Sequence, residues 1–246
     1  AILSRGLGDV YKRQVYNQAL ADGADFVVGP LLKDAVAEIA ALTPSVRTLA
    51  LNSGTVSAEP GSVNLLYQFA LSPEGEAEQV AEKARRDGHL QAVALVPASE
   101  WGQRVAAAFD ARWSLEGGTV VETREYGTDP NGLADTVRSL LHIDRSQARA
   151  KKVLSLLGRR IQHEPRRRTD IDAIFLAAFP REARQLRPQI DFYRATGVPV
   201  YATSHVYSGQ SNPNADGDVN GIIFGDMPWV LRADSDSDGL REHIYT

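Results

Sequence analysis

The stretch DIDAIFLAAFPREARQLRPQIDFYRATGVPVYATS, residues 170–204, decides the fold of this chain. It contains an apolar run at 171–178, a helical pattern opened by Phe179-Pro180 and a second apolar run at 198–203. A strand, a helix and a strand in this order form a βαβ unit, and its crossover is almost always right-handed. A third apolar strand is predicted at 221–224, after a polar loop. The sequence therefore predicts an α/β fold built on a parallel sheet.

Upstream of this unit, short apolar runs and helical patterns alternate in the same way. The strands are predicted at 25–28, 47–51, 66–71, 92–96 and 119–126, and the helices at 15–21, 32–42, 73–87, 100–115, 133–143 and 145–161. Strands that alternate with helices imply mostly parallel sheets with helices on both faces. The loop at 53–64 and the turn at 71–73 break this rhythm. We therefore predict two lobes with a hinged cleft instead of one continuous sheet.

The predicted domain organisation has two lobes and two terminal segments. The first lobe covers 15–72, the second covers 73–230, and a return segment covers 231–246. Residues 1–14 have no apolar period, and Asp9–Gln14 resembles the translated end of a transposon. We hypothesise that residues 1–14 are an artefact of sequence assembly and exclude them from fold reasoning. An ordinary disordered terminus is the alternative.

The composition is typical of a globular protein, with 43% apolar and 24% charged residues among 246. A net charge of −4 gives no bulk attraction to nucleic acid or to anionic lipid. The chain has no cysteine, which excludes disulfides and thiolate metal sites within it. No apolar run approaches the roughly 18 residues that a membrane-spanning helix needs.

Motifs that carry catalysis or bind metals are missing from the predicted strand ends. The sequence has no Gly-rich phosphate loop and no nucleophile elbow. Asp234, Asp236 and Asp238 match the first half of a calcium loop, but Tyr245 holds the twelfth position, where the loop requires Glu. The histidines lack the spacing of metal ligands. We therefore predict no catalytic residue, no metal and no cofactor.

Polar and aromatic side chains nevertheless follow several predicted strands, where α/β folds place their ligands. Ser204 and His205 come directly after a strand, but adjacent residues are rarely oriented as a catalytic pair. We interpret them as residues that line a cleft. The candidate cleft-lining residues are Asn52, Ser53, Ser99, Trp101, Ser204, His205 and Tyr207.

A strongly basic stretch covers residues 145–168, where Glu164 is the single acid. No nucleic-acid recognition motif accompanies these charges, which disfavours a duplex-binding surface. Two interpretations stay open: a solvated basic helix face, and a docking surface for an acidic protein partner. The candidate docking residues are Arg159, Arg160, Arg166, Arg167 and Arg168.

Pro188 lies well inside the helix predicted at 180–194. An interior proline costs about 3 kcal/mol, because it removes one hydrogen bond and clashes with the preceding turn unless the helix bends. We therefore predict a kink, or two short helices that meet near Arg187.

Six segments, in order, resemble the C-terminal domain of the LpoA family, the penicillin-binding protein activators of Gram-negative bacteria. The similarity covers nearly everything from Val15 to Arg232, and six ordered segments are more specific than any one of them. The segments are FVVGPLLK (26–33), LALN (49–52), FALSPE (69–74), DIDAIFLA (170–177), PVYATS (199–204) and FGDMPW (224–229).

The resemblance implies a two-lobed fold like that of a type I periplasmic binding protein, with the first lobe incomplete in this chain. It also implies that the full-length protein is an outer-membrane lipoprotein on the periplasmic side. Its expected partner is a class A penicillin-binding protein, a peptidoglycan synthase, which it would stimulate by protein contact without being an enzyme. No nucleic-acid partner is expected.

A periplasmic solute-binding protein for an amino acid or a similar ligand is the alternative. Such sites need hydroxyls and backbone amides for the carboxylate and an acid for the ammonium. Asn52, Ser53, Ser99 and Ser204 offer polar groups at predicted strand ends. The sequence does not clearly place an acid beside them, which disfavours this alternative.

Overall fold

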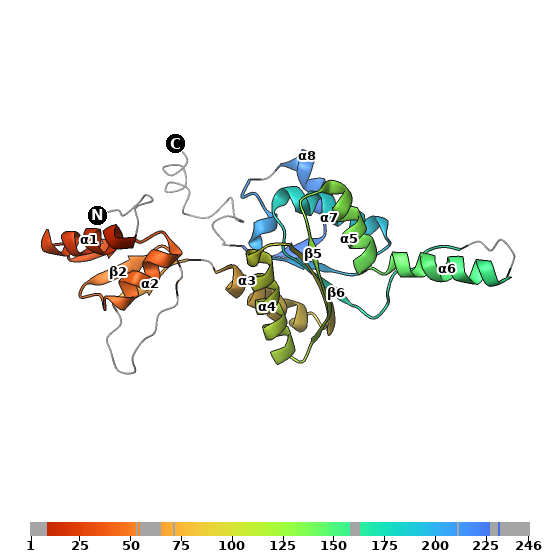
Figure 1. Ribbon diagram of the computed structural model, residues 1–246, viewed down its shortest axis with the longest axis horizontal. Coiled ribbons are helices and arrows are strands. Elements are labelled where there is room, and N and C mark those ends of the chain that lie inside the picture. The colour runs from red at the N-terminus through yellow and green to blue at the C-terminus, as the bar shows by residue number, and fades with distance from the viewer. Residues whose placement is uncertain are drawn as a thin grey trace. The chain divides into compact units, whose positions relative to one another are not determined.

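The computed structural model describes residues 9–52, 54, 65–70, 72–157, 163–210, 212–226 and 231. The chain divides between Ser72 and Pro73 into two compact units, and each contains one sheet (Figure 1). All paired strands in both sheets are parallel and helices flank them, which confirms the predicted fold class. The hinged cleft and the lobe boundaries stay predictions.

The first unit contains a three-stranded sheet and two helices. Its elements are α1 (Asp9–Ala21), β1 (Phe26–Val28), α2 (Lys33–Ala41), β2 (Arg47–Ala50) and β3 (Leu66–Gln68). The strands lie in the order β1-β2-β3, and Val27, Thr48 and Leu66 are register partners on one buried face. Tyr16 of α1 packs in this core, and its hydroxyl lies 3.1 Å from the hydroxyl of Thr48.

Helix α1 begins at Asp9, earlier than the predicted start near Val15. Lys12 and Arg13 lie 3.8 and 3.9 Å from the carboxylate of Glu38 on α2. Ion pairs produce no apolar periodicity in the sequence. The first turns of α1 were therefore not predicted. The hypothesis that residues 1–14 are an artefact stays a prediction.

The second unit contains a five-stranded sheet in the order β5-β4-β6-β7-β8. Its first elements are α3 (Pro73–Arg86), β4 (Gln91–Pro97), α4 (Glu100–Leu115), β5 (Thr119–Tyr126), α5 (Pro130–Leu140) and α6 (Ile143–Leu157). The later ones are β6 (Ala173–Leu176), α7 (Pro180–Phe192), β7 (Val200–Ala202), η1 (Ser204–Val206), α8 (Pro213–Asp216), η2 (Gly217–Val219) and β8 (Ile222–Phe224). The order of the elements places β6 and β4 side by side at the centre.

Helices cover both faces of this sheet, as Figure 1 shows for α3 and α4 against α5 and α7. Alternation along β4 explains the two cores, because successive side chains of a strand point to opposite faces. Ala94 and Val96 pack with α3 and α4, where the rings of Phe109 and Phe175 stack at 4.1 Å. Leu95 packs in the other core, with α5 and α7.

Helix α7 runs without interruption from Pro180 to Phe192 and contains Pro188. The alternative of two short helices that meet near Arg187 is therefore wrong, whereas the kink stays a prediction. Pro188 is exposed, so the carbonyl group that loses its hydrogen bond lies toward the solvent side of the helix. The other face of α7 is fixed by the buried side chains of Leu186 and Ile190.

Candidate functional site

The topology of the second unit predicts a site at the carboxyl ends of its strands. The chain passes from β4 to β5 on one side and then returns to β6, β7 and β8 on the other. In open parallel sheets, ligands bind outside the carboxyl ends of the strands at such a switch point. The residues that follow β4, β6 and β7 here include Trp101, Phe179 and Ser204.

The start of helix α4 sets the position of Trp101. Ser99 caps this helix, because its hydroxyl accepts a hydrogen bond from the backbone N–H of Gly102 at 3.2 Å. Gly102 lies so close to the end of β4 that a Cβ atom there would approach the carbonyl oxygen of Pro97 to 2.1 Å. Only glycine fits, and its presence brings the first turn of α4 against the strand end.

Three rings from three strand ends form an aromatic cluster, which consists of Trp101, Phe179 and His205. The Trp101 ring stacks on Phe179 with centroids 5.0 Å apart and lies 5.0 Å from the imidazole of His205. Phe179 and His205 meet edge to face at 5.8 Å. Aromatic pairs in these arrangements attract one another beyond their burial alone. The cluster ties the starts of α4 and α7 to η1.

Glu76, in the first turn of α3, is the acidic residue of this site. Its Oε2 atom accepts hydrogen bonds from the Ser204 backbone N–H at 3.0 Å and from the Ser204 hydroxyl at 2.8 Å. The Nδ1 atom of His205 lies 3.7 Å from the same oxygen. Burial alone would raise the pKa of Glu76, but the nearby imidazole of His205 and the hydrogen bonds from Ser204 outweigh it and lower the pKa. The carboxylate is therefore ionised at neutral pH.

Sequence reasoning missed Glu76. Acids are expected in the first turn of a helix as favourable charges at its N-terminus, and this is sufficient to explain those that follow Ser72-Pro73. Nothing in the local pattern links this residue to Ser204, far along the chain. Only the packing of α3 beside β7 brings the two together, through a hydrogen bond from the Tyr201 hydroxyl to Asp87 at 2.7 Å among others.

The other predicted cleft residues form different contacts. Tyr207 packs against Phe224 at the end of β8, with ring centroids 5.7 Å apart. Asn52 belongs to the first unit and donates a hydrogen bond to the carbonyl oxygen of Leu31 at 2.8 Å. Ser53 lies outside the described residues. The structure thus brings together Trp101, Ser204 and His205, with Ser99 as the helix cap beside them.

Two of the predicted docking arginines, Arg166 and Arg167, lie in the described segment that precedes β6. Arg166 is exposed, and its backbone N–H donates to the hydroxyl of Ser146 at 3.0 Å. Arg167 donates from its guanidinium to the carbonyl oxygens of Arg168 and Arg194 at 2.8 and 3.2 Å. Arg159 and Arg160 lie outside the described residues.

Arg168 does not belong on a docking surface, because its side chain is only 4% exposed. Its guanidinium pairs with both carboxylate oxygens of Asp170 at 2.8 Å and with Glu122 at 2.7 Å. Hydrogen bonding with Arg168 lowers the pKa of Asp170 to about 2. A buried arginine with a bidentate carboxylate pair stabilises the fold, and its guanidinium is not available to a partner. We therefore remove it from the docking candidates.

The described residues carry no sign of a metal centre or of a membrane span. No group of three or more His, Asp or Glu side chains among them could hold a metal ion. Within the same described residues, every helix is too short or too polar to cross a bilayer.

Together, the parallel sheets and the strand-end site define an α/β protein of the periplasmic-binding-protein class. A solved chain from Chromobacterium violaceum, named as a branched-chain amino acid ABC transporter, is 29% identical with a TM-score of 0.60. The similarity covers 94% of this chain and 64% of that one. The chain belongs to the family described as "LppC putative lipoprotein", whose model matches residues 11–244.

Relatives in this family carry a common name. Penicillin-binding protein activator LpoA from Photobacterium profundum is 32% identical over 86% of this chain and 34% of its own length. The protein of the same name from Dickeya chrysanthemi is 32% identical over 94% of this chain and 35% of its own length. Full-length LpoA from Haemophilus influenzae is 25% identical with a TM-score of 0.65, over 95% of this chain and 38% of that one. The chain thus spans about a third of the length of these relatives.

Proposed function

We propose that this chain is part of an activator of a class A penicillin-binding protein. The activator stimulates peptidoglycan synthesis by protein contact and makes or breaks no bond itself. One observation carries the proposal: relatives that match most of this chain are named as penicillin-binding protein activators. The solved C-domain of Haemophilus influenzae LpoA, which shares the fold, is named as a regulator of PBP1A.

The geometry of the strand-end site supports a role without catalysis. The Ser204 hydroxyl donates to the Glu76 carboxylate, which is only a weak base, and His205 faces the same carboxylate from 3.7 Å. A serine nucleophile needs a base aimed at its hydroxyl and a third group behind that base. Here the serine and the histidine converge on one acid instead, which is an arrangement that stabilises the strand ends.

The proposal includes the cellular location. The family is described as one of lipoproteins, which supports a lipid anchor in the full-length protein and a place on the periplasmic face of the outer membrane. A partner in that compartment is a protein or a cell-wall polymer, and we propose no nucleic-acid partner. The net charge of −4 fits this choice.

A periplasmic solute-binding protein is the second candidate, and Glu76 is the observation that favours it. This residue supplies the acid beside strand-end hydroxyls that an amino-acid site requires. However, Ser204 and His205 surround its Oε2 oxygen, and the side chain is only 13% exposed. An ammonium ligand would have to displace these contacts.

Two measurements on the full-length protein separate the candidates. The first is a pull-down with the class A penicillin-binding proteins of its host, followed by assays of glycan polymerisation and cross-linking. The second is a thermal-shift screen with the common amino acids. Binding and stimulation of the synthase without a ligand-induced shift support the activator. A shift of the melting temperature by one amino acid, with no binding to any synthase, would overturn it.

A further inference from the structure

Helix α6 is packed against the second unit only at its start. Ile143 and Ser146 are its buried residues, and beyond Ser146 none of its side chains is buried. In Figure 1 the helix extends away from the sheet of this unit, and α5 is the helix it contacts. Its later turns expose large apolar side chains, with Leu156 and Leu157 exposed by 76% and 56%. Exposed apolar side chains gathered on one helix indicate a surface that another molecule covers.

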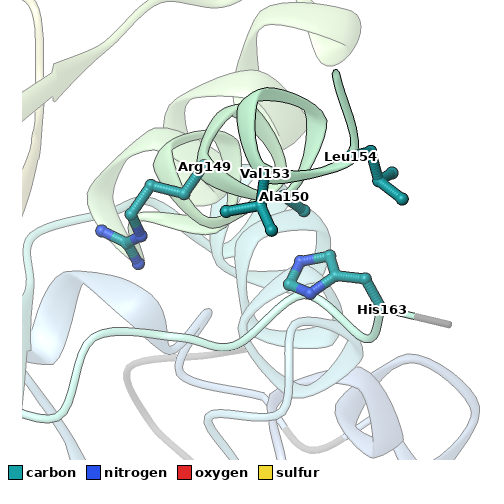
Figure 2. A pocket seen from close by; sticks show the side chains of 5 residues that line it. All are labelled: Arg149, Ala150, Val153, Leu154 and His163. Carbon is teal, nitrogen blue, oxygen red and sulfur yellow. The ribbon is translucent and has the colours of Figure 1, made fainter. Parts of the chain in front are cut away.

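A hollow lies beside this exposed part of the helix. It has a volume of about 220 Å³, and we define the α6 groove by its lining residues, Arg149, Ala150, Val153, Leu154 and His163. Figure 2 shows Ala150 and Val153 on the helix facing the imidazole of His163, with Arg149 and Leu154 at opposite ends. The hollow is smaller than the roughly 300–1,000 Å³ of small-molecule sites. Its size suits a single apolar side chain.

Arg149 lines the α6 groove, and Lys151 and Lys152 follow it on the same helix. Asp144 is the one acid of α6, and the side chains of Arg149, Lys151 and Lys152 form no ion pair with any residue that the structure describes. Some exposed cations of the same unit are paired, as is Arg104 with Glu74 at 2.8 Å. An arginine at the edge of an apolar hollow, on a helix with a net positive charge, is complementary to an acidic, amphipathic ligand.

We propose that the α6 groove docks an acidic amphipathic segment of a protein partner. One apolar side chain of that segment sits in the hollow between Val153 and His163, and a neighbouring carboxylate pairs with Arg149. This inference rests on the proposed function, under which the peptidoglycan synthase is the partner that carries the segment. The basic residues proposed from sequence, Arg166 and Arg167, are at most neighbours of this groove.

An anionic membrane surface is the competing ligand for a basic amphipathic helix. Two observations favour a protein. Helices that lie in the membrane interface typically bury Trp or Phe together with Leu, and α6 has no aromatic residue. The hollow is concave and closed on one side by His163, so a protruding side chain fills it better than a lipid surface does.

The test uses full-length protein and the class A synthase of its host. Arg149→Glu replaces attraction by repulsion, and we expect about tenfold weaker binding, with a smaller difference at high salt. Val153→Asp places a charge in the hollow, and we expect a loss of about thirtyfold, as for a central interface residue. Arg181→Glu is the matched control, since Arg181 is also an exposed arginine on a helix of this unit. It leaves the affinity unchanged.

The outcomes separate this inference from the proposed function. Unchanged synthase binding by both groove variants, when the wild-type protein binds and activates, overturns the groove and leaves the activator intact. No binding by the wild-type protein overturns both. Unfolding is monitored by the melting temperature, and the variants are expected to match the wild type because neither side chain is buried. Wild-type binding to phosphatidylglycerol vesicles that Arg149→Glu abolishes, with synthase binding unaffected, assigns the groove to the membrane and overturns the inference.

A cross-linking experiment identifies the occupant directly. This chain has no cysteine, so Ala150→Cys places a single thiol within it for a photoreactive label. The expected product joins Ala150→Cys to a synthase peptide in which an apolar residue neighbours Asp or Glu. A cross-link confined to another part of the same polypeptide, or to lipid, contradicts the inference.

Discussion

The two sheets of this molecule are built from the same kind of strand but are buried differently. In the second unit, every residue of β6 is buried, because α3 and α4 cover one face and α5 and α7 the other. In the first unit, the face with Val27 is buried, whereas Phe26 and Tyr67 are 47% and 51% exposed. Parallel sheets are normally covered on both sides. An apolar strand pattern thus predicts the strand without telling how many of its faces are covered.

The covered sheet should be the more sensitive of the two to truncation of its side chains. Phe175 of β6 is fully buried and stacks on Phe109. Phe175→Ala leaves a cavity that the surrounding core cannot fill, and we expect a loss of about 3–5 kcal/mol in the free energy of unfolding. Urea denaturation followed by tryptophan fluorescence measures it, since the described tryptophans, Trp101 and Trp113, belong to the second unit.

The matched substitution in the other sheet is Phe26→Ala. Because nearly half of the Phe26 side chain is exposed, it should cost about 1 kcal/mol or less. Circular dichroism of the whole chain records its unfolding. A cost for Phe26→Ala as large as that for Phe175→Ala would mean that both faces of the first sheet are covered, and the comparison would fail.

Strand β5, at one edge of the covered sheet, is stabilised by the buried guanidinium of Arg168. Arg168→Ala removes one of the two guanidinium partners of Glu122 on β5, which is mostly buried, and leaves Arg124 at 2.6 Å as the other. A buried charge that loses every partner costs about 3 kcal/mol or more, and because Arg124 still compensates Glu122 we expect a smaller loss, about 2 kcal/mol. The same fluorescence-detected denaturation measures the loss.

Arg166→Ala is the control for this prediction, because its exposed side chain lies two positions away. It should change the free energy of unfolding by less than about 0.5 kcal/mol. Equal effects of the two substitutions would show that Arg168 is no more important to the fold than a surface residue.

The sequence predicted the elements well where one local signal dominates. Helix α4 begins after Ser99 and ends before Gly117, and strand β5 alternates along its length, so both were predicted with the bounds observed. Pattern reasoning failed at Pro188, because a proline on the exposed side of α7 does not interrupt a helix whose other face is buried. It also missed the first turns of α1, where Lys12 and Arg13 pair with Glu38.

The candidate site was predictable only in part. Ser204 and His205 follow a strand, and this position alone marks them as strand-end residues. Their contact with Glu76 depends on how α3 packs beside β7, and no spacing in the sequence encodes such a contact. The prediction that Arg168 docks a partner failed for a related reason. The arginines at 166–168 cannot be told apart in sequence, and only the position of Glu122 shows which of them is buried.

The strand-end site should make the stability of the second unit depend on pH. The pKa of Glu76 is lowered in the fold, so its contribution is present above the unfolded pKa of about 4.3 and is lost as pH falls through the folded value. Glu76→Gln removes the charge, and we expect a loss of about 1.5 kcal/mol at pH 7. Urea midpoints at pH 7 and at pH 3 should therefore differ less in the variant than in the wild type. An unchanged difference would exclude Glu76 as a source of the pH dependence.

The smallest effect is expected on the open face of the first sheet. Tyr67 is the register partner of Leu49 on β2, and its ring is half exposed, so Tyr67→Lys should change the free energy of unfolding by about 0.5 kcal/mol or less. Its neighbour Leu66 points to the buried face, where Leu66→Ala should cost about 2 kcal/mol. The Thr48 amide donates a hydrogen bond to the carbonyl oxygen of Leu65 at 2.8 Å. The rate of its hydrogen exchange measures the effects of both substitutions. Faster exchange in Leu66→Ala alone would support the difference in burial between the two faces. Equal acceleration in both variants would contradict it.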